Sequence, residues 1–343
     1  MKKGNTGGGV RTRAPGIGAV VAGVAAVAAA MFVWTGGEET VGYSYVVSES
    51  LESDENDGLA SIRERGVVVR RAEVVSGTGE RLAELRFAET DGGPILADWR
   101  PRVDPPFITS APALGEVADL APVLERHLPD DGYRLLAWWD TSRRLRLLGD
   151  VEAVFDEHIG EPLFVPAKWS ASYSRIAEIE TRFWGAPPDD ASRARFMRFA
   201  DSLLKSEDDG IRELTGLAGD GAAVLVLHVR DVVLLGQLAP ERIGVAFRDF
   251  PADGDVHGMV RSARAWVSEN GYHAYATMQP DPDRVRVVAL TDEASGNTLA
   301  ARLLPFIGND QSSVSGTRLV YKTGGFWVYE IEGAKAIAGA SSS

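Results

Sequence analysis

The stretch Ala222-Ala223-Val224-Leu225-Val226-Leu227-His228-Val229 is apolar at every position except His228. An apolar run of this length, rich in Val and Leu, predicts a buried strand. We therefore expect His228 to be a core residue whose polar atoms are satisfied inside the protein.

Short apolar strands alternate with amphipathic helices on both sides of this stretch, throughout residues 115–331. The predicted helices are 115–127, 170–184, 190–205, 255–267 and 297–305. The predicted strands are 134–139, 163–166, 222–229, 242–247, 271–278, 284–290, 317–321 and 326–331. This alternation predicts an α/β or α+β fold with a mixed sheet.

An additional pair of strands is predicted upstream, over residues 67–76 and 81–88, joined by the turn Gly77-Thr78-Gly79. Residues 94–112 contain five prolines and no helical period, which predicts loop or extended chain. We expect one folded domain over residues 61–332, or two subdomains over 61–113 and 114–332. The small-residue tail, 333–343, is expected to be disordered.

A membrane anchor is predicted near the N-terminus. Residues 14–37 carry no charge, and about 20 apolar residues span the hydrocarbon core as a helix. The preceding tail, 1–13, carries four cations, whereas Glu38 and Glu39 follow the span. The positive-inside rule then predicts a cytoplasmic tail, an inner-membrane transmembrane helix, a linker over 38–60 and a large exported, periplasmic domain.

Two alternatives concern the same segment. Ala28-Ala29-Ala30 resembles the small-residue cleavage site of a signal peptide, although apolar residues continue beyond it to Trp34. Both interpretations export the domain. Small residues spaced four apart, from Gly18 to Ala30, also suggest a homodimer through helix packing.

Composition excludes several classes of function. The chain has 343 residues, no cysteine and a formal net charge of −13. Because residues 1–37 hold four of the cations and no carboxylate, the remainder, with 32 basic and 49 acidic side chains, carries −17. Such a domain repels nucleic acid and anionic lipid headgroups. Without cysteine there is no disulfide, thiolate ligand or covalent c-type haem, and we expect no cofactor.

The most unusual segment is Leu136-Ala137-Trp138-Trp139-Asp140-Thr141-Ser142-Arg143-Arg144. If both tryptophans lie on a strand, they point to opposite faces, and Asp140, Thr141, Ser142 and Arg143 lie at its end, where α/β proteins build ligand sites. The arginines would then bind an anion or a partner carboxylate. Alternatively, both tryptophans pack in the core and Asp140 caps the following turn. Membrane oligosaccharyltransferases also contain a Trp-Trp-Asp run, but they have many membrane spans and this chain has one.

A second aromatic group, Trp169 and Tyr173, follows Val165-Pro166-Ala167-Lys168. These rings are expected near Trp139, as core or as part of a partner surface. The candidate partner or ligand surface therefore comprises Trp138, Trp139, Asp140, Thr141, Ser142, Arg143, Trp169 and Tyr173.

No set of residues in the sequence predicts a particular reaction. The chain has no Gly-x-Ser-x-Gly elbow, phosphate loop or dinucleotide-binding glycine triplet. Glu178 and Glu180 are expected to be solvated charges on a helix. The five histidines are scattered, and Asp253 to His257 is interpreted as a turn and helix start rather than a metal site.

The single N-terminal span, the lack of cysteine and the motifs Ala137 to Arg143 and Leu163-Phe164-Val165-Pro166 resemble the hydroxylamine oxidation protein HaoB family. The resemblance covers roughly residues 115–331. That family accompanies the multihaem hydroxylamine oxidoreductase of ammonia- and methane-oxidising bacteria, so the resemblance implies an accessory role beside a periplasmic haem enzyme. It carries over no catalytic residue.

We therefore expect a membrane-anchored periplasmic accessory protein that assists or docks a multihaem hydroxylamine oxidoreductase. The alternatives are an envelope hydrolase or transferase with a site at Asp140–Arg143, and a generic envelope interaction module.

Overall fold

The computed structural model describes residues 42–48, 57–102, 112, 114–127, 133–149, 151–158, 173–219, 223–252, 254, 256–281 and 283–331. The chain divides into two compact units, residues 1–37 and 38–343, and every described residue belongs to the second. The predicted transmembrane segment, the strand predicted at 163–166, Trp169 and the tail lie outside the described residues. Within the described ranges, no helix is both long and apolar enough to cross a membrane.

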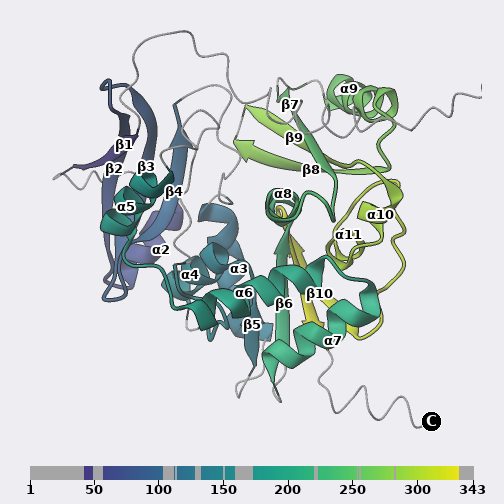
Figure 1. The fold of residues 1–343 in the computed structure, drawn as a ribbon, viewed down its shortest axis with the longest axis horizontal. Coiled ribbons are helices and arrows are strands. Elements are labelled where there is room, and N and C mark those ends of the chain that lie inside the picture. Colours follow the sequence, from purple (N-terminus) through teal and green to yellow (C-terminus); the bar gives the residue numbers. More distant parts are fainter. Residues whose placement is uncertain are drawn as a thin grey trace, which may run out of the picture. The chain divides into compact units, whose positions relative to one another are not determined.

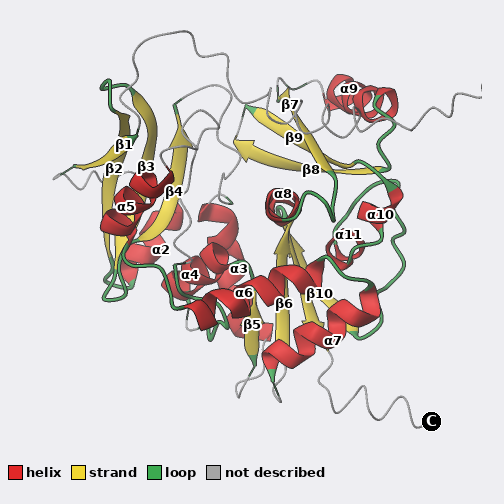
Figure 2. Ribbon diagram, viewed as in Figure 1, coloured by secondary structure: helices red, strands yellow, loops and turns green. Residues whose placement is uncertain are grey.

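Helices and three separate sheets make up the described part, so the prediction of a mixed α/β fold is confirmed at that level (Figure 2). The strands carry the labels of Figure 1, in which colour follows the sequence.

Sheet 1 is an antiparallel meander in the order β1-β2-β3-β4. Its strands are β1 (Tyr43–Val47), β2 (Val68–Ser76), β3 (Arg81–Glu89) and β4 (Ile95–Pro101). The predicted pair β2 and β3 is confirmed. One correction concerns β1, which lies inside the range predicted as linker. Tyr43 and Tyr45 on this strand bond to Glu180, far along the chain. The proline-rich segment, predicted as loop or extended chain, is extended over β4.

Sheet 2 has the order β10-β11-β6-β5. Its strands are β5 (Arg134–Leu136), β6 (Ala223–His228), β10 (Thr317–Thr323) and β11 (Phe326–Ile331). β5 and β6 are parallel, and the other two pairs are antiparallel. β6 is buried along its whole length, as its apolar sequence predicts. Val224 and Val226 pack into one core and Leu225 and Leu227 into another, because successive side chains leave opposite faces.

Helices from both ends of the sequence fill these two cores. The core on the Val224 side receives α2 (Asp57–Glu64), α3 (Leu114–His127) and α4 (Trp139–Leu148). The core on the Leu225 side receives α6 (Asp190–Leu203), α7 (Glu207–Ala218), α8 (Val229–Leu238) and α11 (Leu299–Leu303). Helix α11 lies within the helix predicted over residues 297–305, and the short helix α10 (Glu293–Gly296) precedes that range.

Sheet 3 is antiparallel, in the order β7-β9-β8, with β7 (Val245–Pro251), β8 (Ala274–Asp281) and β9 (Arg284–Leu290). The side chains of β9, like those of β6, pack into two different cores. Val288 and Leu290 join the core of sheet 2, whereas Val287 and Ala289 pack beneath α9 (Val256–Glu269). The strands predicted over residues 271–278 and 284–290 are confirmed as β8 and β9, and the structure pairs them antiparallel.

The remaining helix, α5 (Tyr173–Trp184), packs on sheet 1. Phe183 stacks on Tyr45 with ring centroids 3.9 Å apart and meets Phe87 edge to face. The first sheet therefore has its own aromatic covering, contributed by α5, which starts 72 residues after the end of β4.

Candidate functional site

The carboxyl ends of the parallel strands β5 and β6 are the most chemically distinctive place in the described structure. Helix α4 starts directly after β5, and helix α8 starts directly after β6. Charged residues in the first turns of both helices therefore meet at one edge of sheet 2. This is where open α/β sheets commonly bind ligands.

A buried ion pair joins the two helices. Arg230 of α8 donates through both terminal nitrogens to Asp140 of α4, at 2.7 and 2.8 Å. Asp231 lies on the other side of the same guanidinium, at 3.4 Å. Burial alone would raise the pKa of Asp140, but Arg230 overcomes it and holds that pKa below its usual value. Asp231 gains less from Arg230, and burial raises its pKa.

His228 connects this pair to the terminal hairpin. Its ring Nδ1 accepts from the backbone of Arg230 at 3.0 Å, and Asp231 accepts from the backbone of His228 at 2.9 Å, which forms a capping box at the start of α8. Its Nε2 lies 3.5 Å from the carboxylate of Glu116. His228 is therefore buried with polar contacts at both ring nitrogens, as the sequence predicts.

Glycines allow the hairpin to approach this histidine. A Cβ atom at Gly325 would lie 2.0 Å from Nε2 of His228. Gly324 has a φ of +51°, which a glycine adopts without strain, and it lies against the side chain of Glu116.

The structure corrects the placement of the tryptophans. β5 ends at Leu136, so Trp138 precedes α4 and Trp139 is its first residue, and neither lies on a strand. Trp138 packs edge to face on Phe196 within the core, and Trp139 meets His158 in the same way, at 5.0 Å. Only Trp139 and Asp140 of the six candidates in this segment retain partial exposure, because the others turn inward with the buried face of α4.

The other predicted site residues are held by the protein itself. Ser142 donates to the carbonyl of Ala137, and Arg143 donates to the carbonyl of Pro94. Arg144 donates to the carbonyls of Leu96 and Pro112. Both arginines are buried and donate to backbone carbonyls of β4 and its surroundings, and binding of an outside anion by these arginines stays a prediction. Burial lowers the pKa of each guanidinium to about 10, so both stay charged at neutral pH.

The second aromatic group is described only in part. Tyr173 is the first residue of α5, and nothing is described of its side chain, while Trp169 lies outside the described ranges. Neither residue is therefore brought together with Trp139 in the described structure.

A carboxylate that was predicted to be solvated is buried instead. Glu180 of α5 has no exposed surface and accepts hydrogen bonds from the hydroxyls of Tyr43 and Tyr45, the latter at 2.6 Å. Burial is the main reason that the pKa of both tyrosines is raised, so both remain donors. Sequence spacing gave no signal for this, because the partners lie more than 130 residues away.

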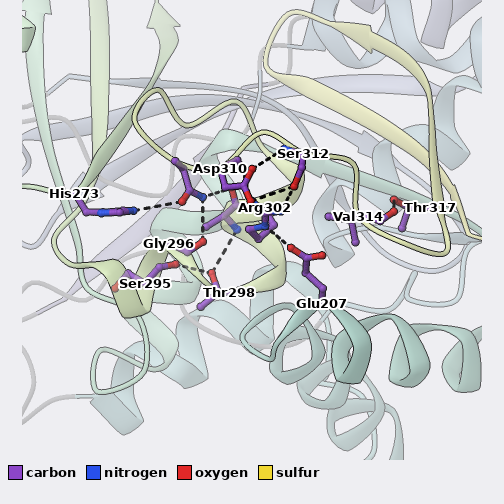
Figure 3. A network of polar contacts seen from close by, with 12 residues as sticks. Glu207, His273, Ser295, Gly296, Thr298, Arg302, Asp310, Ser312, Val314 and Thr317 are labelled. Carbon is purple, nitrogen blue, oxygen red and sulfur yellow. Dashed lines mark hydrogen bonds and ion pairs between the residues drawn. The ribbon is translucent and has the colours of Figure 1, made fainter.

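A second polar network surrounds Arg302 of α11 (Figure 3). Its guanidinium pairs with Glu207 and Asp310 and donates to Ser312 at 2.7 Å. Asn309 donates to the carbonyls of Gly296 and Ala301. The bonds run between α7, α10 (Glu293–Gly296), α11 and the loop that follows α11, so this network holds a loop in place rather than forming an open site.

Neither network offers reactive chemistry. Asp140 is neutralised by Arg230, and the hydroxyl of Ser142 points to a backbone carbonyl. Among the described residues, no group of three His, Asp or Glu side chains could hold a metal ion. Two surface depressions in the described part are lined by other residues. One is lined by residues of α5, and the other by residues of α6, α7 and the link between them.

Comparison with known proteins gives one extensive match. The sequence model of the family described as HaoA-associated protein HaoB matches residues 11–331, nearly the whole chain. No curated protein matches the chain. Among solved structures, the C-terminal domain of C. jejuni PglB is similar, with 13% identity over 63% of this chain and 99% of that chain. Its TM-score is 0.32, which supports no conclusion about fold or function.

Proposed function

This chain belongs to the HaoB family, and on that premise we propose that it is a membrane-anchored accessory protein that docks HaoA, a multihaem hydroxylamine oxidoreductase. The observation that carries the proposal is the family match over residues 11–331, because the family is named for its association with HaoA. The matched range also contains the apolar segment 14–37.

The membrane anchor rests on the sequence. Residues 14–37 are uncharged and follow four cations, the pattern of a single span with its N-terminus in the cytoplasm. A tether of this kind would keep the folded domain in the same compartment as its partner and raise the local concentration of the two proteins.

We assign the docking surface to the outer face of α5. A depression of about 610 Å³ lies there, lined by Ser174, Ala177, Glu178, Thr181 and Arg182. The small side chains on this face allow a partner to approach the helix closely. The charges of Glu178 and Arg182 would fix the orientation of a partner with complementary charges. Tyr173, one of the predicted partner residues, begins the same helix.

Capture from native membranes tests this function. The tagged full chain, solubilised in mild detergent, is expected to retain HaoA, detected by antibody and by haem absorbance in stoichiometric amount. Thr181→Arg would place a large cation in the depression and reduce capture at least tenfold. Glu241→Arg serves as the matched control, because Glu241 is exposed on a loop between α8 and β7.

We propose no reaction for the Asp140 cluster. Its carboxylates and arginines bond to one another and to the backbone. Their burial is sufficiently explained by their role in joining sheet 1, α4 and α8.

A further inference from the structure

One end of sheet 1 carries exposed arginines, although the domain is acidic overall. This end contains the start of β1, the β2–β3 turn and the end of β4, as the pairings of Tyr43 with Ser76 and of Ala83 with Pro101 show. Among the described charged residues at this end of the sheet, those with high solvent exposure are Arg81, Arg100, Arg102 and Glu80. The arginine side chains are 69%, 50% and 56% exposed.

The carboxylates at this end lie deeper than the arginines. The ion pairs join Arg81 to Glu73 at 3.0 Å, Arg100 to Asp98 at 3.1 Å and Arg102 to Glu84 at 2.8 Å. The three carboxylate side chains are between 9% and 24% exposed. A guanidinium has five N–H donors, so each arginine can keep its carboxylate and still offer donors outward.

The chain enters the domain at this same end. The amide of Gly77, in the β2–β3 turn, donates to the carbonyl of Gly42 at 3.3 Å. Only residues 38–42 separate β1, which starts at Tyr43, from Gly37, the last residue of the predicted span. This spacer is short, because each residue extends the chain by at most about 3.5 Å.

We propose that this end of sheet 1 rests on the bilayer, where Arg81, Arg100 and Arg102 bind the phosphates of anionic phospholipids. The inference depends on the anchor of the proposed function. Guanidinium and phosphate match as bidentate partners. The net negative charge of the domain does not prevent the contact, because charges more than about 8 Å away are largely screened at physiological salt.

The absence of cysteine makes a direct test possible. A single Thr78→Cys in the β2–β3 turn, or Leu319→Cys on the exposed part of β10, can be labelled with a fluorophore in the otherwise unchanged full chain. Each protein is reconstituted into nanodiscs of phosphatidylcholine and phosphatidylglycerol, with and without a headgroup spin-labelled lipid as quencher. We expect the label at Thr78 to be quenched at least threefold more than the label at Leu319.

Charge reversal tests the role of the arginines. R81E/R100E/R102E is expected to reduce quenching at Thr78 at least twofold in nanodiscs with phosphatidylglycerol, and to leave it unchanged in pure phosphatidylcholine. R195E/R198E/R212E, on α6 and α7, is the matched control and is expected to change neither.

The outcomes separate the two proposals. A chain that does not co-elute with nanodiscs at all would overturn the anchor. A chain that co-elutes but shows equal quenching at both labels would overturn the orientation proposed here. Equal effects of the two triple variants would remove the arginines from the contact, even if the label at Thr78 were quenched.

Discussion

Arg230 reaches from the start of α8 to Asp140 at the start of α4 and donates two hydrogen bonds to its carboxylate. The pair lies at the carboxyl ends of two parallel strands and joins the two helices that follow them. Arg144 extends the connection to sheet 1 through the carbonyls of Leu96 and Pro112. These residues hold the fold together.

The first prediction concerns this pair. Asp140→Ala leaves the guanidinium of Arg230 buried with only the weaker contact to Asp231, and should lower the free energy of unfolding by about 3 kcal/mol. Urea unfolding followed by circular dichroism measures the loss. The double variant D140L/R230M removes both charges and is expected to recover at least half of it. If Asp140→Ala unfolds at the same urea concentration as the wild type, the pair does not stabilise the fold.

The second prediction concerns pH. Burial, followed by the charge of Arg143, lowers the pKa of His158 to about 4. In the unfolded chain His158 therefore binds a proton near pH 6.5, whereas in the folded protein it is protonated only near pH 4. Stability from this residue is complete above pH 6.5 and is lost as the pH falls, by about 2 kcal/mol at pH 5. His158→Phe, which preserves a ring between Trp139 and Trp184, should show a shallower dependence between pH 7 and 5.

An equal pH dependence in both proteins would show that other groups are responsible. The effect of Asp140 can be distinguished from that of His158 by the pH at which it occurs. Because the pKa of Asp140 is lowered in the folded protein, the stability that this carboxylate contributes is lost below about pH 4, outside the pH range in which His158 acts.

The third prediction concerns Gly325. Alanine there would place its Cβ 2.0 Å from the ring of His228, which is fixed by Arg230 and lies beside Glu116. We expect Gly325→Ala to cost about 2 kcal/mol through overpacking. Gly216→Ala, within α7, is the control: its Cβ would have no neighbour within 4 Å, so it should be neutral or stabilising. Thermal unfolding of the two variants distinguishes steric conflict from a general effect of replacing glycine.

The fourth prediction concerns Glu180. Glu180→Leu removes the acceptor for the hydroxyls of Tyr43 and Tyr45, and β1 should lose part of its attachment to α5. Hydrogen exchange at residues 43–47 should become at least tenfold faster, while exchange in β9 should not change. Protection of β1 that is identical to the wild type would show that its pairing with β2 is sufficient.

Several elements of the fold could be predicted because their signals are local. The β2–β3 and β8–β9 pairs have apolar alternation and a turn sequence between them, and β6 is apolar at every position except His228. Helix α8 was missed because the apolar run continues from β6 into it, and periodicity alone does not separate a buried strand from a buried helix. The capping box of His228 and Asp231 marks the boundary, but histidine is an unusual capping residue.

The candidate site could not be predicted because its contacts join distant parts of the chain. Asp140 was singled out from the sequence as a candidate site residue, but its partner Arg230 is 90 residues away. The prediction for Glu180 was wrong for the same reason: helical spacing suggested exposure, while the tyrosines that bury it lie on β1. The predicted strand continues through Trp138 and Trp139 because both residues are apolar. The start of α4 is marked in the sequence only by the charged residues that follow them.

Association of this HaoB-family protein with HaoA is tested most directly by capture of the tagged full chain from native membranes, with mild crosslinking, followed by quantification of haem and HaoA in the eluate. We expect HaoA in stoichiometric amount with the wild type and with Glu241→Arg, and at least tenfold less with Thr181→Arg. An eluate without HaoA after crosslinking, in which the tagged chain itself is intact, would contradict this association.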